Sequence, residues 1–188
     1  MIKGRDSFIL GRSSSGKTFS CIIGALQRID LTESNLQVIM LYPTREHVFN
    51  VLSAVRAIAQ FTETKSIATI GGIPLRENHR QLKEELYHLI CGTPGRTLDT
   101  IQKGLINVSR LKMLVIDEFD EILGRGFNDQ IKVILSSVPA ACQLVLISCT
   151  TSPEIEGLVN GLMVNPALFT YNRPSLREIR HHFLLVEQ

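Results

Sequence analysis

Short apolar runs rich in β-branched residues recur along the chain and alternate with segments whose apolar residues lie at helical spacing. The runs cover residues 7–10, 36–41, 65–70, 88–91, 112–116, 143–147 and 167–171. Their length and composition predict strands. Because the runs are apolar on both faces and helical segments join them, the pattern predicts an α/β fold with a mostly parallel sheet and helices on both faces. In such folds, ligands bind at the carboxyl ends of the strands.

The helical spacing is clearest in the segment after the second predicted strand. One apolar stripe there is expected to pack against the sheet. It consists of Phe49, Leu52, Val55, Ile58 and Ala59. No repeat, low-complexity tract or linker interrupts the chain before about residue 170. We therefore predict one domain over residues 1–172. The turn-forming residues that follow predict an extended tail over residues 173–188, where alternation at 179–186 indicates another strand. We expect further polypeptide to follow this tail.

Composition sets broad limits. The chain has 188 residues, of which 44% are hydrophobic and 20% charged, as in an ordinary soluble globule. It shows neither a secretory signal nor an apolar run long enough to cross a bilayer, so we expect no membrane association and an intracellular location, with the cytoplasm favoured over the nucleus. A net charge of +2 is compatible with a nucleic-acid partner but too small to indicate one.

Cysteine and histidine usage points away from metal sites. The four cysteines are widely scattered without a C-x-x-C pair, so we expect reduced core thiols rather than disulfides or a zinc site. They are Cys21, Cys91, Cys142 and Cys149. The adjacent His181 and His182 lie in a segment that reads as extended, where neighbouring side chains point to opposite faces. A structural role is therefore expected for both.

The strongest local motif is Gly11–Thr18, which matches G-x-x-x-x-G-K-[ST] between a predicted strand and a predicted helix. Backbone N–H groups of such a loop and the positive end of the helix form a cradle for phosphate oxygens. Lys17 would reach the terminal phosphates, and the Thr18 hydroxyl would bind Mg²⁺. The predicted cofactor-binding residues are Arg12, Ser13, Ser14, Ser15, Gly16, Lys17 and Thr18. A serine-rich turn with an incidental lysine is the alternative, which the strand, loop and helix order disfavours.

A second motif follows the apolar run at 113–116, which ends in two carboxylates. Asp117 would hold the magnesium ion through its water shell, and Glu118 would orient or deprotonate the attacking water. With Lys17, they form the predicted catalytic set. The alternative is an acidic cap on a helix that begins near Asp120, since acids favour helix N-termini. The presence of the phosphate loop favours the catalytic interpretation.

Taken together, six motifs in this order and spacing resemble motifs I, Ia, GG, Ib, II and III of the DEAD-box helicase family. They are Gly11–Thr18, Pro43-Thr44-Arg45-Glu46, Gly71-Gly72, Thr93-Pro94-Gly95-Arg96, Asp117-Glu118-Phe119-Asp120 and Ser148-Cys149-Thr150. Between the motifs, segments such as KMLVIDE, RGFNDQI and QLVLIS are most similar to the translation initiation factor 4A branch. The resemblance covers essentially the whole chain. It implies a RecA-like domain that binds ATP and Mg²⁺, the first half of an ATP-dependent RNA helicase.

The resemblance also assigns RNA contacts, because three of these motifs grip the backbone of single-stranded RNA in the family. The implied contacts are Pro43, Thr44, Arg45, Gly71, Gly72, Thr93, Pro94, Gly95 and Arg96. Such contacts go to phosphate and sugar and would be independent of RNA sequence. The glycines and Pro94 are also ordinary turn residues.

A third group implied by the resemblance couples the nucleotide site to RNA. In the family, motif III hydrogen-bonds to the last Asp of motif II, which assigns coupling roles to Asp120, Ser148 and Thr150. In a RecA-like strand order, the strand that ends at Ser148 would lie between the phosphate-loop strand and the strand that ends before Asp117. A polar strand end that satisfies backbone donors is the alternative.

Several positions depart from the family pattern. Ser14 replaces a glycine, and it would be strained if the loop needs a positive φ there. Phe119 replaces the alanine of D-E-A-D, and a ring at that buried position would have to displace its neighbours. Cys149 replaces the alanine of motif III, a smaller change. His47 and Val48 replace the Leu-Ala that follows the PTRE segment, a milder change on a helix.

Two parts of the family machinery are not found in the sequence. Only ten residues precede Gly11, without the Q motif that reads adenine, and no arginine fingers of a second RecA-like domain follow. We therefore expect negligible hydrolysis and no unwinding by this chain alone. The expected partners are RNA, a second RecA-like domain and a scaffold protein of the initiation factor 4G type. A P-loop kinase or GTPase would share the phosphate loop and the acidic strand, but a GTPase is disfavoured by the lack of N-K-x-D. A degenerate domain that only binds RNA or protein stays an alternative.

Overall fold

The computed structural model describes residue 1, residues 3–72 and residues 74–171. Each of the seven runs that the sequence analysis assigns to strands within the described residues forms one. The strands are β1 (Ser7–Gly11), β2 (Val38–Leu41), β3 (Ser66–Thr69), β4 (Leu89–Gly92), β5 (Met113–Ile116), β6 (Gln143–Ser148) and β7 (Ala167–Tyr171). The predicted tail and the strand expected at 179–186 lie outside the described residues.

The seven strands form one sheet in the order β3-β4-β2-β5-β6-β1-β7, and each neighbouring pair is parallel. Strand β6 lies between β1 and β5, as predicted for the strand that ends at Ser148. Because all strands run in one direction, the segments that follow β1, β2, β4, β5 and β6 emerge at the same edge of the sheet. These segments carry the motifs of the predicted site.

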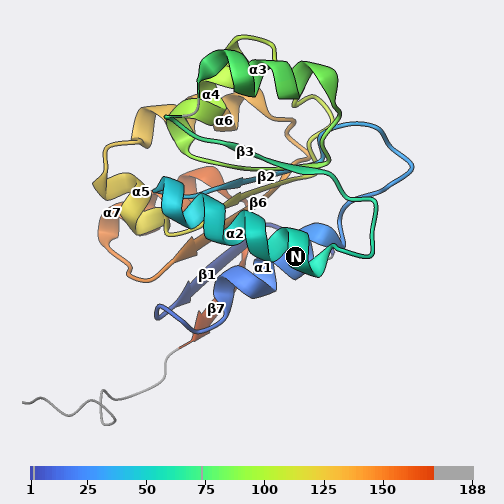
Figure 1. The fold of residues 1–188 in the computed structure, drawn as a ribbon. Coiled ribbons are helices and arrows are strands. Elements are labelled where there is room, and N and C mark those ends of the chain that lie inside the picture. Colours follow the sequence, from blue (N-terminus) through green and yellow to red (C-terminus); the bar gives the residue numbers. More distant parts are fainter. Residues whose placement is uncertain (2, 73, 172–188) are drawn as a thin grey trace, which may run out of the picture.

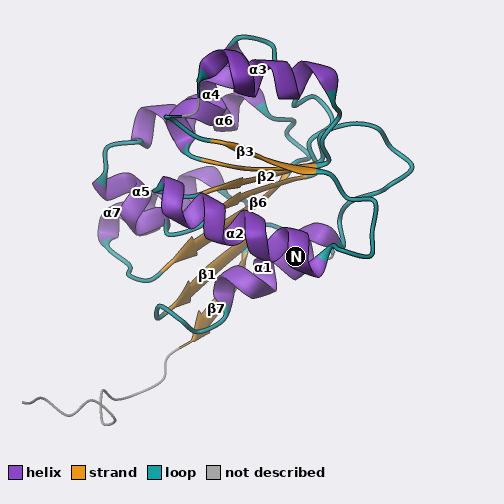
Figure 2. Ribbon diagram, viewed as in Figure 1, coloured by secondary structure: helices purple, strands orange, loops and turns teal. Residues whose placement is uncertain are grey.

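Helices cover both faces of the sheet (Figures 1 and 2). They are α1 (Lys17–Leu26), α2 (Arg45–Ile58), α3 (Leu75–Glu84), α4 (Pro94–Gln102), α5 (Phe119–Gly124), α6 (Asn128–Ser137) and α7 (Pro153–Leu162). Strand residues alternate between two cores: Val38 and Met40 pack with α1 and α2, whereas Ile39 and Leu41 pack on the opposite face. This alternation explains why the strands are apolar on both faces.

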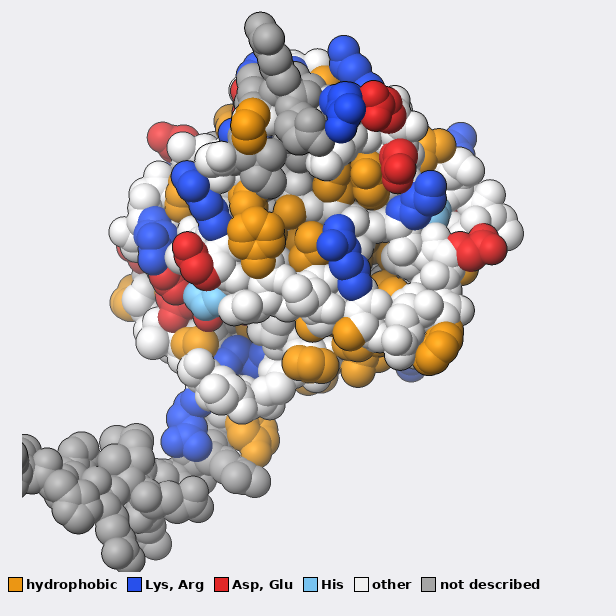
Figure 3. Space-filling view, in the orientation of Figure 1, with side chains coloured by type: hydrophobic (Ala, Val, Ile, Leu, Met, Phe, Trp, Pro, Cys, Tyr) orange, Lys and Arg blue, Asp and Glu red, His pale blue; other side chains and the backbone are white. Residues whose placement is uncertain are grey.

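Two expectations about the core need correction. Leu52, Val55 and Ala59 of the predicted stripe are buried, but Phe49 and Ile58 are 50% and 39% exposed. The buried face of α2 is completed by Val48 and Val51, which follow the i, i+3, i+4 and i+7 spacing more closely. Figure 3 shows hydrophobic side chains left exposed among basic ones on the face that carries α1 and α2.

The cysteine prediction is confirmed only in part. All four thiols are free, and Cys21 and Cys91 are buried, but Cys142 and Cys149 are only partly buried. Cys149 lies at the carboxyl edge of the sheet rather than in the core, because it follows the last residue of β6. Among the described residues, no helix is long and apolar enough to span a membrane.

Candidate nucleotide and nucleic-acid sites

The predicted phosphate loop connects β1 to α1 in the expected order. Gly16 precedes the helix with φ of 86°, a conformation that glycine adopts without strain. Ser14 also has a positive φ of 60°. The left-handed conformation is therefore required where the family pattern has glycine, and a side chain there costs about 1–2 kcal/mol.

The amine of Lys17 lies inside the loop. It donates hydrogen bonds to the carbonyl oxygens of Gly11 and Arg12, and it lies 3.6 Å from the Cys149 sulfur. Arg12 contributes this carbonyl, but its side chain is exposed and does not line the pocket that the rest of the loop surrounds. The sequence analysis expected the strand that ends at Ser148 to lie beside the phosphate-loop strand, but it did not assign a contact with Lys17 to Cys149.

The paired acids meet the loop at Thr18. Its hydroxyl donates to Oδ2 of Asp117 at 2.6 Å, and the Glu118 backbone N–H donates to Oδ1 of Asp117 at 2.8 Å. Asp117 is only 2% exposed. Burial raises the pKa of Asp117, although both hydrogen bonds and the nearby Lys17 oppose the shift. A hydroxyl and a carboxylate at this separation form the all-oxygen donor pair that Mg²⁺ prefers.

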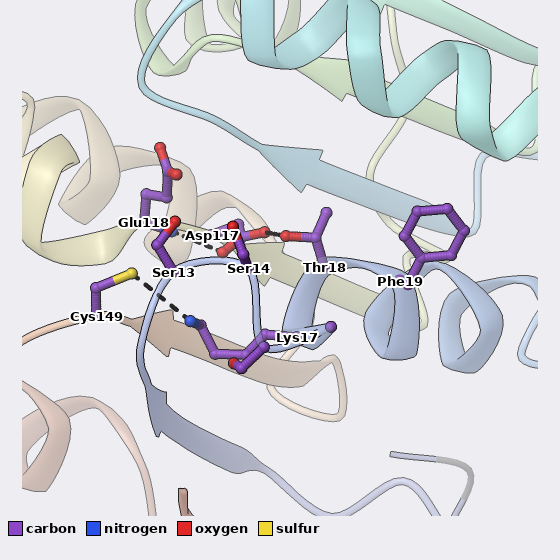
Figure 4. Close-up of a pocket in the computed structure, with 10 residues that line it drawn as sticks. Ser13, Ser14, Lys17, Thr18, Phe19, Asp117, Glu118 and Cys149 are labelled. Atoms are coloured by element: carbon purple, nitrogen blue, oxygen red, sulfur yellow. Dashed lines mark hydrogen bonds between the residues drawn. The ribbon is translucent and has the colours of Figure 1, made fainter. Parts of the chain in front are cut away.

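These groups line one pocket of about 260 Å³ (Figure 4). Its lining is Ser13, Ser14, Ser15, Gly16, Lys17, Thr18, Phe19, Asp117, Glu118 and Cys149. The structure thus brings six of the seven predicted cofactor-binding residues and both acids together. Their separate roles in binding and catalysis stay predictions.

Glu118 is held at the mouth of this pocket by a strained backbone and by polar neighbours. Its φ is 51°, and its Oε2 lies 3.0 Å from Nδ1 of His47 at the start of α2. Burial raises the pKa of Glu118, the charge of His47 opposes this shift, and the nearby Glu121 reinforces it. Glu121 is itself bound by Arg125 at 2.6 Å. Sequence reasoning treated His47 as a mild helix substitution and did not predict this contact.

The predicted coupling residues also meet. Thr150 donates to Oδ2 of Asp120 through its backbone N–H at 3.0 Å and its hydroxyl at 2.7 Å. Burial raises the pKa of Asp120, but hydrogen bonding from Thr150, Cys149 and Ser148 outweighs it and the net pKa is lowered. The hydroxyl of Ser148 also donates to the carbonyl oxygen of Thr150 at 2.6 Å. Ser148 therefore supports the Thr150 backbone.

The predicted RNA contacts gather in a groove of about 630 Å³ at the same edge of the sheet. Seven of the nine line it, namely Pro43, Thr44, Arg45, Gly71, Thr93, Gly95 and Arg96. Helices α2 and α4 both begin at this groove, so their positive ends face it. The Thr44 hydroxyl caps α2 by accepting the His47 backbone N–H at 3.2 Å.

The two remaining predicted contacts, Gly72 and Pro94, do not line the groove. Pro94 is buried as the first residue of α4. Gly72 has φ of 88°, and a side chain there would collide with the guanidinium of Arg45. The glycine pair thus lets Arg45 lie flat against the loop. The groove also includes Arg125 and Phe127, which sequence reasoning did not select; the RGFNDQI segment was the only signal for them.

The fold and the phosphate-loop geometry define a nucleotide-binding α/β domain with a parallel sheet. The DEAD/DEAH box helicase family model matches residues 1–158. The chain belongs to this family.

The relatives match this chain along nearly its whole length. It is 34% identical over 192 residues to the ATP-dependent RNA helicase FAL1 of Vanderwaltozyma polyspora, covering 100% of this chain and 48% of that protein. It is also 34% identical over 187 residues to eukaryotic initiation factor 4A of Caenorhabditis elegans, covering 98% of this chain and 46% of that protein. The chain therefore spans about half the length of the curated relatives it matches.

A solved structure confirms the RecA-like fold. A variant of S. cerevisiae Dbp5 bound to Nup159, Gle1, IP6 and ADP superimposes with a TM-score of 0.82 at 26% identity. The match covers 90% of this chain and 44% of that chain.

Proposed function

We propose that this chain is the ATP-binding and RNA-binding half of an ATP-dependent RNA helicase of the initiation factor 4A type, acting in translation initiation or mRNA metabolism. The observation that carries the proposal is the 2.6 Å contact between Thr18 and Asp117, which joins the phosphate loop to the acidic strand end. Relatives named initiation factor 4A and FAL1 are equally similar to the chain at 34% identity. The assignment to translation therefore depends on the segments that resemble initiation factor 4A.

The donor set fits a magnesium nucleotide. Thr18 and Asp117 would hold Mg²⁺, directly or through water, and the loop amides with Lys17 would hold the phosphates. Bound Mg²⁺ would neutralise charge on the phosphates, and it would also compensate the buried carboxylate of Asp117. Glu118, which lines the same pocket, would orient the attacking water and accept its proton.

RNA would bind along the groove formed by the starts of α2 and α4. Arg45 and Arg96 would contact phosphates, and the glycine pair beside Arg45 would let the strand approach closely. The bond between Asp120 and Thr150 lies close to the nucleotide pocket, since Asp120 is two residues after Glu118 and Thr150 follows Cys149. It would couple the state of this pocket to bound RNA. A second RecA-like domain would close over both sites, and a scaffold of the initiation factor 4G type would assist it.

The nucleotide part of the proposal is tested by Mg²⁺-dependent ATP binding to the chain. Replacing Lys17 with alanine should weaken binding at least tenfold, because hydrogen bonds to charged groups contribute about 1.5–3 kcal/mol each. Lys103→Ala is a matched control, since Lys103 pairs with Asp99 at 2.6 Å away from the pocket. Equal affinities for the two variants would contradict the assigned phosphate site.

Turnover is tested by joining the chain to the second RecA-like domain of an initiation factor 4A relative. We expect RNA-stimulated ATP hydrolysis that Glu118→Gln abolishes, and no measurable hydrolysis by the unjoined chain. A joined protein that binds ATP but never turns it over would instead identify a degenerate binding module.

The RNA groove is tested by salt dependence. Arg45→Ala and Arg96→Ala should each weaken binding of single-stranded RNA of any sequence and lower the slope of log K against log salt by about 0.7. Arg110→Ala, at an exposed position outside the groove, is the control. A loss confined to particular RNA sequences would argue against backbone contacts.

A further inference from the structure

The side chain of Glu118 has an unusual polar partner. Its Oε2 lies 3.0 Å from Nδ1 of His47, close enough for an ion pair when the imidazole is protonated. Both atoms are buried, and neither makes a hydrogen bond to a described residue. The contact between them is therefore one of charge rather than an aligned hydrogen bond.

His47 is fixed independently of this contact. It lies in the first turn of α2, where its backbone N–H is held by the hydroxyl of Thr44 at 3.2 Å. The next residue, Val48, is fully buried against the sheet. The imidazole therefore projects from a rigid helix start rather than from a loop, and it can restrain the carboxylate that it contacts.

Glu118 also lies close to a second carboxylate. Ligand atoms of His47, Glu118 and Glu121 all lie within 4.8 Å of one another, and Arg125 anchors Glu121 at 2.6 Å. Two carboxylates this close repel each other when both are ionised. A proton on the imidazole of His47, in the same cluster, offsets that repulsion.

We propose that His47 is a positioning residue for Glu118: its imidazole, 3.0 Å from Oε2, attracts the carboxylate when protonated and holds it in place along the phosphate-loop pocket that Glu118 lines. This inference rests on the proposed function, in which Glu118 activates water. The family pattern has leucine at this position, so the contact is a feature of this chain. In Figure 4 the Glu118 carboxylate is directed away from Lys17, toward the side of the pocket where α2 lies. His47 itself touches no nucleotide atom in this scheme.

Turnover by the joined protein tests the catalytic part. His47→Leu should lower kcat about tenfold and leave KM for ATP within about twofold, because the lost interaction acts on the base and not on nucleotide binding. His47→Lys restores a cation on the same helix turn and should recover part of the loss, whereas the uncharged His47→Asn should not. Asn50→Leu is the matched control, since Asn50 is exposed one turn further along the same helix.

The contact itself is tested without turnover, by NMR of imidazole nitrogens in the 188-residue chain. The His47 signals, assigned by their absence in His47→Asn, should show a protonated Nδ1 and should shift in Glu118→Gln. Unchanged signals in Glu118→Gln, or an unchanged kcat in His47→Leu, would overturn the proposal. Absence of turnover in the unsubstituted joined protein would overturn the proposed function and the catalytic part together, whereas the NMR result decides the contact alone.

Discussion

The hydroxyl of Thr18 and the carboxylate of Asp117 are joined at 2.6 Å, although they come from the first and the fifth of the six motifs. The strand order explains this proximity. Strand β1 leads into the phosphate loop, β5 ends before Asp117, and only β6 separates the two. The predicted metal site is therefore a product of topology, since parallel neighbours deliver their carboxyl ends to the same edge.

This relationship predicts a metal-specific defect. Thr18→Val keeps the shape of the side chain but removes the oxygen, so affinity for ATP should fall about tenfold in the presence of Mg²⁺ and little in EDTA. Titration calorimetry with and without metal measures both. Ser20→Ala is the control, because the Ser20 hydroxyl bonds to the Gly16 carbonyl on the exposed side of α1. A defect of equal size in EDTA would exclude Thr18 as a magnesium ligand.

Replacing Asp117 with asparagine should stabilise the free chain but remove its stabilisation by Mg²⁺ and ATP. Burial raises the pKa of Asp117 in the folded chain, so the folded state binds this proton more tightly than the unfolded state. Stability from this group is therefore present below the unfolded pKa and is lost as pH rises through the raised folded value. Asp117→Asn removes the buried charge and should raise Tm at neutral pH, with the gain shrinking toward low pH.

The measurement is thermal unfolding of both proteins from acidic to neutral pH, without nucleotide. Addition of Mg²⁺ and ATP should stabilise the unsubstituted chain and not the variant. A variant that is less stable at neutral pH would show that the carboxylate is stabilised by its hydrogen bonds more than it is opposed by burial.

Replacing Ser14 with glycine should increase the free energy of unfolding. The φ of 60° at Ser14 is costly for a side chain by about 1–2 kcal/mol, while glycine loses about 0.5–1 kcal/mol through the entropy of the unfolded chain. Ser14→Gly should therefore stabilise the chain by up to about 1 kcal/mol. Ser13→Gly is the matched control, since Ser13 has no positive φ, and it should destabilise. Urea unfolding of both variants measures the difference.

Sequence reasoning reached the strands and the grouping of loop and acids from local pattern plus a simple rule of parallel sheets. The order of strands around Ser148 came instead from the resemblance to RecA-like domains. The glycine of the family pattern identified Ser14 as the residue that a positive φ would strain, and its φ is 60°. Side-chain contacts at the carboxyl edge of the sheet depend instead on the conformations of the segments that connect the strands to the helices.

The contacts that were missed are of this second kind. The contact of His47 with Glu118 joins the start of α2 to the segment after β5, and that of Cys149 with Lys17 joins the segment after β6 to the phosphate loop. The position of β6 was expected, but not which side chains meet there. The phase of α2 was misjudged for a related reason: Phe49 is apolar but lies off the buried stripe, and periodicity alone did not distinguish it from Val48. Exposed apolar residues are common and weaken such assignments.

The core packs around the ring of Phe119, and its removal tests how much this packing contributes to stability. The ring is fully buried in the core cluster that α5, α6 and α7 form against the sheet, where the family pattern has alanine. The structure therefore places the ring inside the core. Phe119→Ala should consequently destabilise the chain by about 3–5 kcal/mol, because it leaves a cavity where the ring now packs. Phe61→Ala is the control, since Phe61 is 92% exposed and its loss should change stability by less than about 0.5 kcal/mol. Urea unfolding measures both, and a small effect at Phe119 would mean that the neighbouring side chains collapse into the vacated space as the family's alanine would require.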